Sequence, residues 1–111
     1  MTAILDEASN LHVFFSDLSR IDCLYSLSVL SLQPGYIAPT IIDECLIDIK
    51  DGRHPVVEKM AATQFIPNDT TLDSQNNHLI ILTGPNMAGK STFIRQTAVL
   101  VIMAHIGSYI P

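Results

Sequence analysis

The residues best suited to chemistry lie in one glycine-rich stretch, 79-LIILTGPNMAGKSTF-93. Gly84 and Gly89 enclose four residues, and Lys90 and Ser91 follow, which fits the pattern G-x-x-x-x-G-K-[ST]. Glycines at both ends permit backbone angles that turn successive N–H groups toward one anion. The loop leads into a helical pattern, so the positive end of that helix would face the same anion. The stretch therefore predicts a phosphate-binding loop.

The side chains after the second glycine suit the phosphates of ATP and a Mg²⁺ ion. Lys90 can reach the β- and γ-phosphate oxygens and is the candidate catalytic residue, and Ser91 offers a hydroxyl ligand to Mg²⁺. The expected nucleotide contacts are Gly84, Pro85, Asn86, Met87, Ala88, Gly89, Lys90, Ser91 and Thr92. The alternative is an ordinary turn between two elements, with Lys90 in solvent and Asn86 as a turn residue that tolerates left-handed backbone angles.

The elements on both sides of the loop support the phosphate-binding interpretation. Residues 79–83 form a short apolar run, typical of a strand that is buried on both faces. A helical pattern runs from Lys90 to about His105, and Gly107 is expected to end it. Such a strand–loop–helix unit needs neighbouring parallel strands, and the chain offers few segments that could supply them.

A long helix is expected at the start of the chain. Residues 2–31 show apolar side chains at three-and-four spacing, and Pro34-Gly35 ends the pattern. A helix of roughly 30 residues is about 45 Å long, which is too long for a compact domain of this size. We expect this helix to be shared with a part of the protein outside the chain.

The middle of the chain is expected to hold β structure and turns. Residues 36–51 carry strand signals, with a turn at Asp51-Gly52. The segment 53–60 could form a short helical turn, in which His54 is interpreted as a structural residue that hydrogen-bonds the backbone. Residues 63–78 are polar and rich in turn residues.

Composition excludes several functional classes. The 111 residues are 48% hydrophobic with a mean hydropathy of +0.32, which argues against disorder. The net charge is −5 and the six basic residues are scattered, so no basic stripe for a DNA backbone is visible. The acidic N-terminus lacks the pattern of a signal peptide, and the longest apolar run, Ala98–Ala104, is too short for a bilayer. Cys23 and Cys45, without a CxxC pattern, indicate reduced thiols that fill small apolar volumes, and we expect a cytoplasmic protein without membrane contact.

Three motifs together resemble one family, the bacterial MutS DNA mismatch-repair ATPases. The loop and its continuation, TGPNMAGKSTFIRQTA followed by IGSYIP, are similar to that family's P-loop. GRHPVVE at 52–58 and FIPND at 65–69 match the family in the same order, and residues 18–35 resemble the helix that returns from its clamp and lever region. The methionine of GPNM, with KST after it, is typical of the mismatch-repair branch.

The resemblance implies a fold and further site residues. The fold would be α/β, a partial P-loop NTPase domain of the ABC-ATPase type preceded by a long α-helix. Residues 1–35 would be the C-terminal part of the lever helix, and residues 36–111 the N-terminal half of the ATPase domain. Phe65 is similar to the aromatic residue that stacks on adenine, although by itself it would be interpreted as a core residue. Asn86 matches the asparagine that lies near the γ-phosphate.

The resemblance also shows what the stretch lacks. In this family the acidic residues of the Walker B strand and a signature loop lie downstream, and the chain ends before them, so we expect a fragment that is inactive alone. The full family protein would recognise mispaired double-stranded DNA through domains absent here, act as a homodimer, and use ATP binding and hydrolysis to ADP to switch its clamp. The alternatives are a truncated, non-catalytic remnant with at most nucleotide binding, and a small P-loop kinase.

Overall fold

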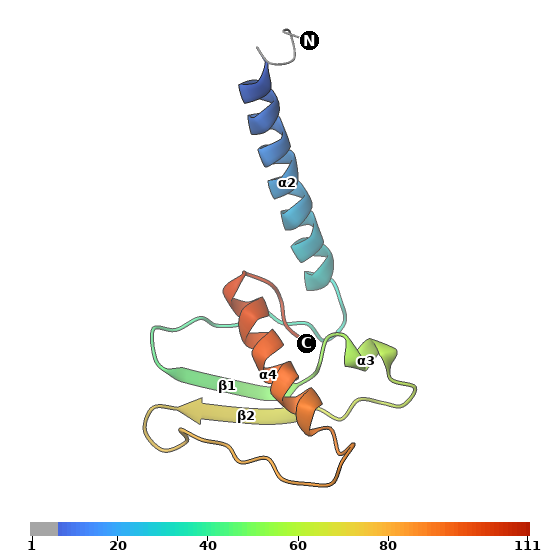
Figure 1. The fold of residues 1–111 in the computed structure, drawn as a ribbon, viewed down its shortest axis with the longest axis vertical. Helices are drawn as coiled ribbons and strands as arrows, with labels where there is room; N and C mark the ends of the chain where they lie inside the picture. Colours follow the sequence, from blue (N-terminus) through green and yellow to red (C-terminus); the bar gives the residue numbers. More distant parts are fainter. Residues whose placement is uncertain (1–6) are drawn as a thin grey trace.

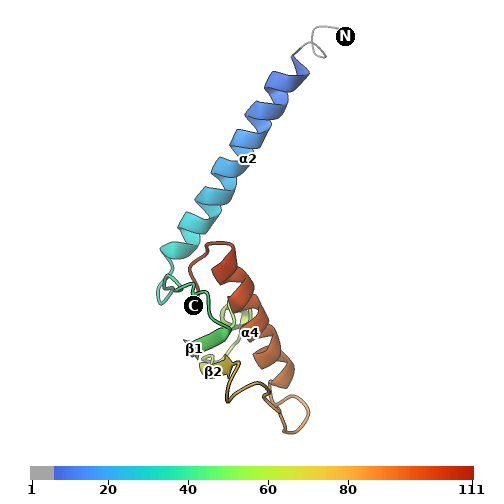
Figure 2. The ribbon, with the colours of Figure 1, turned by 90° about the vertical axis from the view of Figure 1, so that its left-hand side faces the viewer.

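A long helix projects from a smaller α/β body in the computed structural model, which describes residues 7–111 (Figure 1). The elements in chain order are α2 (Ala8–Ser31), β1 (Leu46–Gly52), α3 (Val57–Met60), β2 (Asn68–Asp73) and α4 (Lys90–His105). The molecule extends over 64 × 38 × 26 Å. In the perpendicular view, α2 again points away from the other elements (Figure 2). The fold combines helices with a small antiparallel sheet, which agrees with the expected mixture of α and β elements but not with the expected parallel strands.

Helix α2 confirms the predicted helix over the part of it that the structure describes. The prediction began at residue 2, and residues 2–6 lie outside the described part of the chain. The 24 residues from Ala8 to Ser31 give a length of about 36 Å. None of them is buried. The apolar positions that predicted the helix therefore face solvent over its whole length.

The sheet consists of two antiparallel strands, and one of them was not expected. Strand β1 agrees with the alternation at 45–50, but β2 lies inside 63–78, which was interpreted as turns only. Leu46 pairs with Asp73 and Ile49 with Thr70, and a bulge interrupts the register before Gly52. The predicted turn at Asp51-Gly52 is wrong, because both residues belong to β1 and the positive φ of Asp51, 50°, forms part of the bulge.

The core of the body lies where α4 crosses β1 (Figure 1). Leu100 is 1% exposed and Gln96 is fully buried, and these are the two buried residues of α4. The Nε2 group of Gln96 donates to the carbonyl oxygen of Gly52 at 2.8 Å. A Cβ atom at Gly52 would lie 3.2 Å from Cδ1 of Leu100 and 2.5 Å from Cγ2 of Ile49. Glycine at position 52 therefore allows the helix to approach the strand.

The apolar run before the loop is not a strand in the structure. Residues 79–83 pair with no other segment of the described chain, and Leu79 and Ile81 are 77% and 76% exposed. The predicted buried strand is wrong for this chain, because a parallel strand needs neighbours to take its hydrogen bonds and cover its faces. Of the strand signals expected over residues 36–51, those before β1 give only an isolated antiparallel bridge between Ile37 and Ile110.

The bounds of α4 and the position of α3 agree with the predictions made from the sequence. Helix α4 runs from Lys90 to His105 as predicted, and the N–H groups of Gly107 and Ser108 donate to the carbonyls of Ala104 and Met103. This is the Schellman arrangement that ends a helix at a glycine. The segment 53–60 holds α3, which confirms the expected helical turn.

The two cysteines do not fill apolar volumes. Cys23 on α2 and Cys45 just before β1 are both free and exposed, so that interpretation is wrong. Neither position has a neighbouring element that could cover it, since α2 buries nothing and Cys45 lies in an irregular segment. No helix among residues 7–111 combines the length and apolar character needed to cross a bilayer.

Candidate phosphate-binding loop

The loop between residues 83 and 90 adopts a conformation that its glycines permit. Gly84 has a φ of 144° and Gly89 has a φ of 87°, and Gly89 is the N-cap residue directly before α4. A Cβ atom at Gly89 would meet no atom within 4 Å, so the backbone angle rather than space favours glycine there. The loop closes on itself through a hydrogen bond from the Ala88 N–H to the Pro85 carbonyl, at 3.4 Å.

The first turn of α4 presents unpaired N–H groups beside this loop. Gly89 caps the helix without a side-chain hydrogen bond, and its carbonyl accepts from the Phe93 N–H at 2.9 Å. The amides of Lys90, Ser91 and Thr92 donate to no group within residues 7–111. Free amides at a helix N-terminus, together with the helix dipole, favour an anion at this place.

Lys90 folds back onto the loop. Its Nζ group donates to the carbonyl oxygens of Gly84, at 2.5 Å, and Pro85, at 2.6 Å. The side chain is half-buried although the loop around it is exposed. The ammonium therefore lies over the loop, where its charge adds to that of the helix dipole.

The left-handed position of the loop is Met87 rather than Asn86. Met87 has a φ of 66°, and its side chain is fully exposed. A left-handed angle in a residue other than glycine costs about 1 to 2 kcal/mol. The interpretation of Asn86 as the left-handed residue is therefore wrong, because the next residue, Met87, has that conformation. The Met87 side chain fills no core volume. Asn86 is exposed in the middle of the loop.

Ser91 and Thr92 lie in the first turn of α4, whereas Phe65 lies in a different segment of the chain. Ser91 is exposed and Thr92 is half-buried in the first turn of α4, and neither side chain donates a hydrogen bond within the described residues. Phe65 lies in the connection between α3 and β2, where its ring is half-buried. The ring forms no aromatic pair in the part of the chain that the structure describes. The expected contact with adenine stays a prediction.

The motif GRHPVVE has a structural role that sequence reasoning recognised only in part. His54 is buried, and its Nδ1 accepts from the N–H groups of Val56 and Val57, both at 3.3 Å, which confirms the structural interpretation of this histidine. Arg53, which we had not singled out, donates from Nε to Glu58 at 2.7 Å. The opposite charges at positions 53 and 58 were the feature of the sequence that could have predicted this ion pair.

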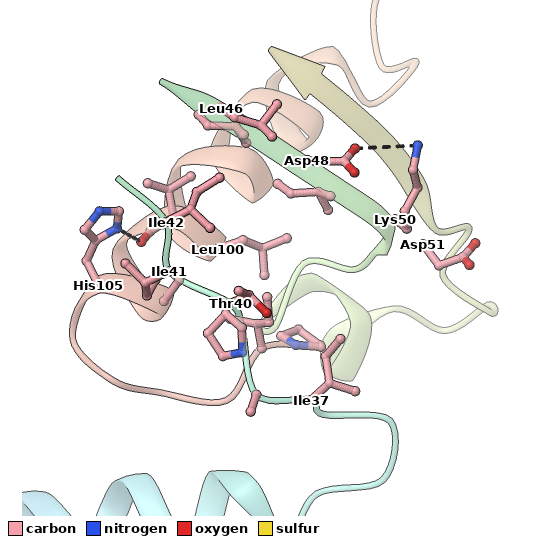
Figure 3. A pocket seen from close by; sticks show the side chains of 18 of the residues that line it. Ile37, Thr40, Ile41, Ile42, Leu46, Asp48, Lys50, Asp51, Leu100 and His105 are labelled. Atoms are coloured by element: carbon pink, nitrogen blue, oxygen red, sulfur yellow. Dashed lines mark hydrogen bonds and ion pairs between the residues drawn. The ribbon is translucent and has the colours of Figure 1, made fainter. Parts of the chain in front are cut away.

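A cavity of about 650 Å³ lies at the opposite end of α4 from the loop (Figure 3). Apolar side chains of the irregular segment, among them Ile41 and Ile42, face Leu100 and the last turn of α4 across it. His105 borders the cavity, and its ring nitrogen is hydrogen-bonded to the Val101 carbonyl at 2.8 Å. Leu100 comes ten residues after Lys90, a rise of about 15 Å along the helix. The cavity is therefore separate from the loop, and it lacks the loop's free amides.

Comparison with known proteins connects the loop to one family. The family described as MutS domain V matches residues 80–111, which include the whole loop and α4. The chain is 55% identical over 92 residues to the DNA mismatch repair protein MutS of Clostridium tetani, and 49% identical over 109 residues to that of Acetivibrio thermocellus. It is also 43% identical over 113 residues to the DNA mismatch repair protein msh3 of Aspergillus fumigatus.

These similarities cover most of this chain and a small part of each relative. The three alignments include 82%, 97% and 98% of the chain, but only 10%, 12% and 10% of the respective relatives. The chain thus spans about a tenth of the length of the curated relatives that it matches.

Proposed function

The chain belongs to the MutS family of DNA mismatch repair proteins, and from that premise we propose that residues 84–92 bind the phosphates of ATP. The loop would be the nucleotide site of a protein that recognises mispaired double-stranded DNA. In that protein, ATP binding and hydrolysis would switch a clamp on the DNA, and two copies would act as a homodimer. The DNA contacts would come from parts of the protein beyond this chain.

The observation that carries the proposal is the set of free amides at the start of α4. Three successive N–H groups, from Lys90 to Thr92, have no acceptor within the described residues. In this exposed loop the amides bond water, and a phosphate oxygen replaces that water with a charge-assisted bond, which is worth about 1.5 to 3 kcal/mol. Gly89 has no Cβ atom to hinder an approaching anion, and it permits the φ of 87° at the helix N-cap.

Lys90 would exchange partners when the phosphates bind. The Nζ group now donates to two loop carbonyls, which are neutral acceptors. A phosphate oxygen is a charged acceptor and forms a stronger bond with an ammonium. Release from Gly84 and Pro85 would direct the ammonium toward the β- and γ-phosphates, and the loop carbonyls would return to solvent.

The remaining ligands fit the same site. Ser91 has an exposed hydroxyl with no partner in the described chain, and it would hold Mg²⁺ beside the phosphates. The ion neutralises charge on the phosphate oxygens when it is bound. Phe65, half-buried in the connection between α3 and β2, would stack on adenine.

A second candidate is nucleotide binding without hydrolysis. Within residues 7–111 no three His, Cys, Asp or Glu side chains gather as a metal-ion site. Hydrolysis requires an acidic residue on the metal and a group that positions water. We therefore expect residues 1–111 alone to show no turnover of Mg²⁺-ATP. Turnover that survives repurification and vanishes with Lys90→Ala would reject this second candidate.

The experiment that tests the proposal is a titration of the chain with a fluorescent ATP analogue in the presence of Mg²⁺. Lys90→Ala should weaken binding at least about tenfold, since one charge-assisted bond is worth about 1.5 to 3 kcal/mol. The matched control is Lys50→Ala, which removes an exposed lysine of β1 whose ion pairs, at 3.6 and 3.8 Å, lie at the surface.

The two variants separate the possible outcomes. Loss of binding in Lys90→Ala alone, with an unchanged helical circular dichroism signal, supports the proposal. Equal binding by Lys90→Ala and the unaltered chain would reject the loop as the phosphate site. Equal weakening in both lysine variants would indicate general attraction of an anion to positive charge rather than a built site.

A further inference from the structure

Two adjacent residues, Gly52 and Arg53, contact different helical parts of the molecule. The Gly52 carbonyl accepts from the buried Nε2 group of Gln96, in the second turn of α4, at 2.8 Å. The Nη2 group of Arg53 donates to the carbonyl of Gly35, at 3.1 Å. Gly35 lies four residues after the end of α2. One peptide unit therefore connects the helix that carries the loop to the segment that leaves α2.

The Arg53 side chain is held on both of its edges. Its Nε group donates to Glu58 on α3 at 2.7 Å, and the two side chains are only 21% and 30% exposed. The planar guanidinium can serve Glu58 and Gly35 at once, because its donors point in fixed directions. The backbone N–H of Arg53 also faces the Pro111 carbonyl, at 3.5 Å. Glu58 thus orients the guanidinium toward Gly35.

The fit at Gly35 is tight. A Cβ atom at this position would lie 2.8 Å from Nη2 of Arg53, closer than Cβ atoms come to other heavy atoms, so the guanidinium would have to shift. Gly35 also has a φ of 74°. The guanidinium therefore packs directly against the backbone at the turn where the chain leaves α2.

Two further contacts lie near the base of α2, one weak and one that holds the chain just after Gly35. No residue of α2 is buried, so the helix makes no packed interface with the body. Lys59 and Gln33 are joined by an exposed hydrogen bond of 3.5 Å, at the limit of such bonds. The bridge between Ile37 and Ile110, with bonds of 2.8 and 2.9 Å, fixes the chain two residues after Gly35. In both views α2 meets the body near the C-terminus (Figures 1 and 2).

We propose that Arg53 is a positioning residue that, together with Gly52, fixes the direction of α2 relative to α4. Gly52 anchors the link on α4 and Arg53 anchors it on the turn after α2. A change in the position of α4 would therefore reach α2 through one peptide unit. The proposal concerns the geometry of the chain and holds whether or not the loop binds ATP, so its failure is distinguishable from failure of the proposed function.

The test measures distances between spin labels on cysteines of the full chain. One label pair reports the angle between the helices: native Cys23 on α2 and Arg95→Cys on α4, in a Cys45→Ser background. Both positions are exposed. A second pair reports the body alone: native Cys45 and Arg95→Cys, in a Cys23→Ser background. Pulsed electron paramagnetic resonance gives the distance distribution of each label pair, with and without the Arg53→Ala substitution.

Arg53→Ala should broaden the distribution of the first pair at least about twofold and leave the second pair unchanged. A first pair that keeps its width in Arg53→Ala would overturn the proposal, because another contact would then hold α2. Equal broadening of both pairs would also overturn it, because Arg53 would then stabilise the body and not position α2.

Two further variants keep the test decisive if Arg53→Ala lowers stability. Arg53→Lys retains the charge beside Glu58 but lacks the planar fork, so it should broaden the first pair to an intermediate width. Lys59→Ala removes the weak contact with Gln33 and should leave both widths unchanged. Broadening by Lys59→Ala that matches that of Arg53→Lys would assign the role to the Lys59–Gln33 contact and reject the link.

Discussion

Helices α2 and α4 show the same kind of sequence pattern and opposite degrees of burial. The 16 residues of α4 include Leu100, 1% exposed, and the fully buried Gln96, both against β1. The 24 residues of α2 include none that is buried, and Leu24 is 66% exposed. Apolar spacing predicts that a helix has a face to cover, but it does not say whether the cover lies within the same chain.

The difference matters for function because the candidate loop lies on the anchored helix. Gly52 and the bulge before it allow close packing of α4 on β1, which fixes the direction of the helix and its free amides. The exposed face of α2 has no such partner in the described chain. A phosphate site needs the first kind of support, because the donors must hold their positions as the anion arrives.

The largest expected effect is on the free energy of unfolding when one leucine side chain is shortened on each helix. Leu100→Ala should lower the free energy of unfolding by about 2 to 4 kcal/mol, because it leaves a cavity in the small core. Leu24→Ala, which deletes the same atoms from an exposed position, should change it by about 0.5 kcal/mol or less. Urea unfolding of both variants, followed by circular dichroism, measures the two values. Similar losses in the two variants would show that α2 is covered in solution.

A smaller effect is expected at the contact point of α4. Gly52→Ala would place a Cβ atom 2.5 Å from Cγ2 of Ile49 in the same strand and 3.1 Å from Nε2 of Gln96 on α4, so the strand must shift at the bulge and α4 must move slightly away. Overpacking of this kind costs about 1 to 3 kcal/mol. The same urea experiment measures the loss. Full stability in Gly52→Ala would mean that α4 does not rely on this close approach, and the contrast with α2 would lose its structural basis.

The smallest effect concerns a turn that local hydrogen bonds hold without packing. The pKa of the Asp73 carboxyl lies well below its usual value because it accepts from the amide of Asn76, then from those of Gln75 and Asn77, and from the Asn77 side chain. A depressed pKa stabilises the folded turn above the unfolded pKa of about 3.9, and the contribution disappears as the pH falls through the folded value.

The NMR chemical shift of the Asn76 amide reports whether the Asp73 carboxyl is ionised, because this amide donates to it. Between about pH 5 and about pH 3 this chemical shift should stay nearly constant, since Asp73 remains ionised in the folded turn. Asp73→Asn retains an oxygen acceptor but cannot titrate, and it serves as the control. A shift of the Asn76 resonance centred near about pH 4 would contradict the depressed pKa.

Sequence reasoning located the helices better than the strands. The pattern from Lys90 to His105 gave the limits of α4, because a loop glycine and a terminal glycine bound it on both sides. Strand β2 was missed because its residues, NDTTLD, are polar and only Thr70 is buried. Residues 79–83 look like a buried strand but have no partner in the described chain, because strand formation depends on neighbours that local sequence does not specify.

The candidate site was predicted in composition more than in geometry. The motif indicates which residues could hold phosphate, and the structure adds free amides at three of them. The contacts of Lys90 with the loop carbonyls and the left-handed angle of Met87 could not be predicted from spacing. The pairing of Arg53 with Glu58 was readable as opposite charges five residues apart, but its contact with Gly35 depends on tertiary structure.

The measurement that tests the central claim most directly is an amide NMR titration of the full chain with Mg²⁺-ATP. The account predicts that the amide resonances of Lys90, Ser91 and Thr92 shift first and most, because these unpaired N–H groups would receive the phosphate oxygens. Shifts confined to residues around the separate cavity, such as Leu100 and His105, with none in the loop, would contradict it.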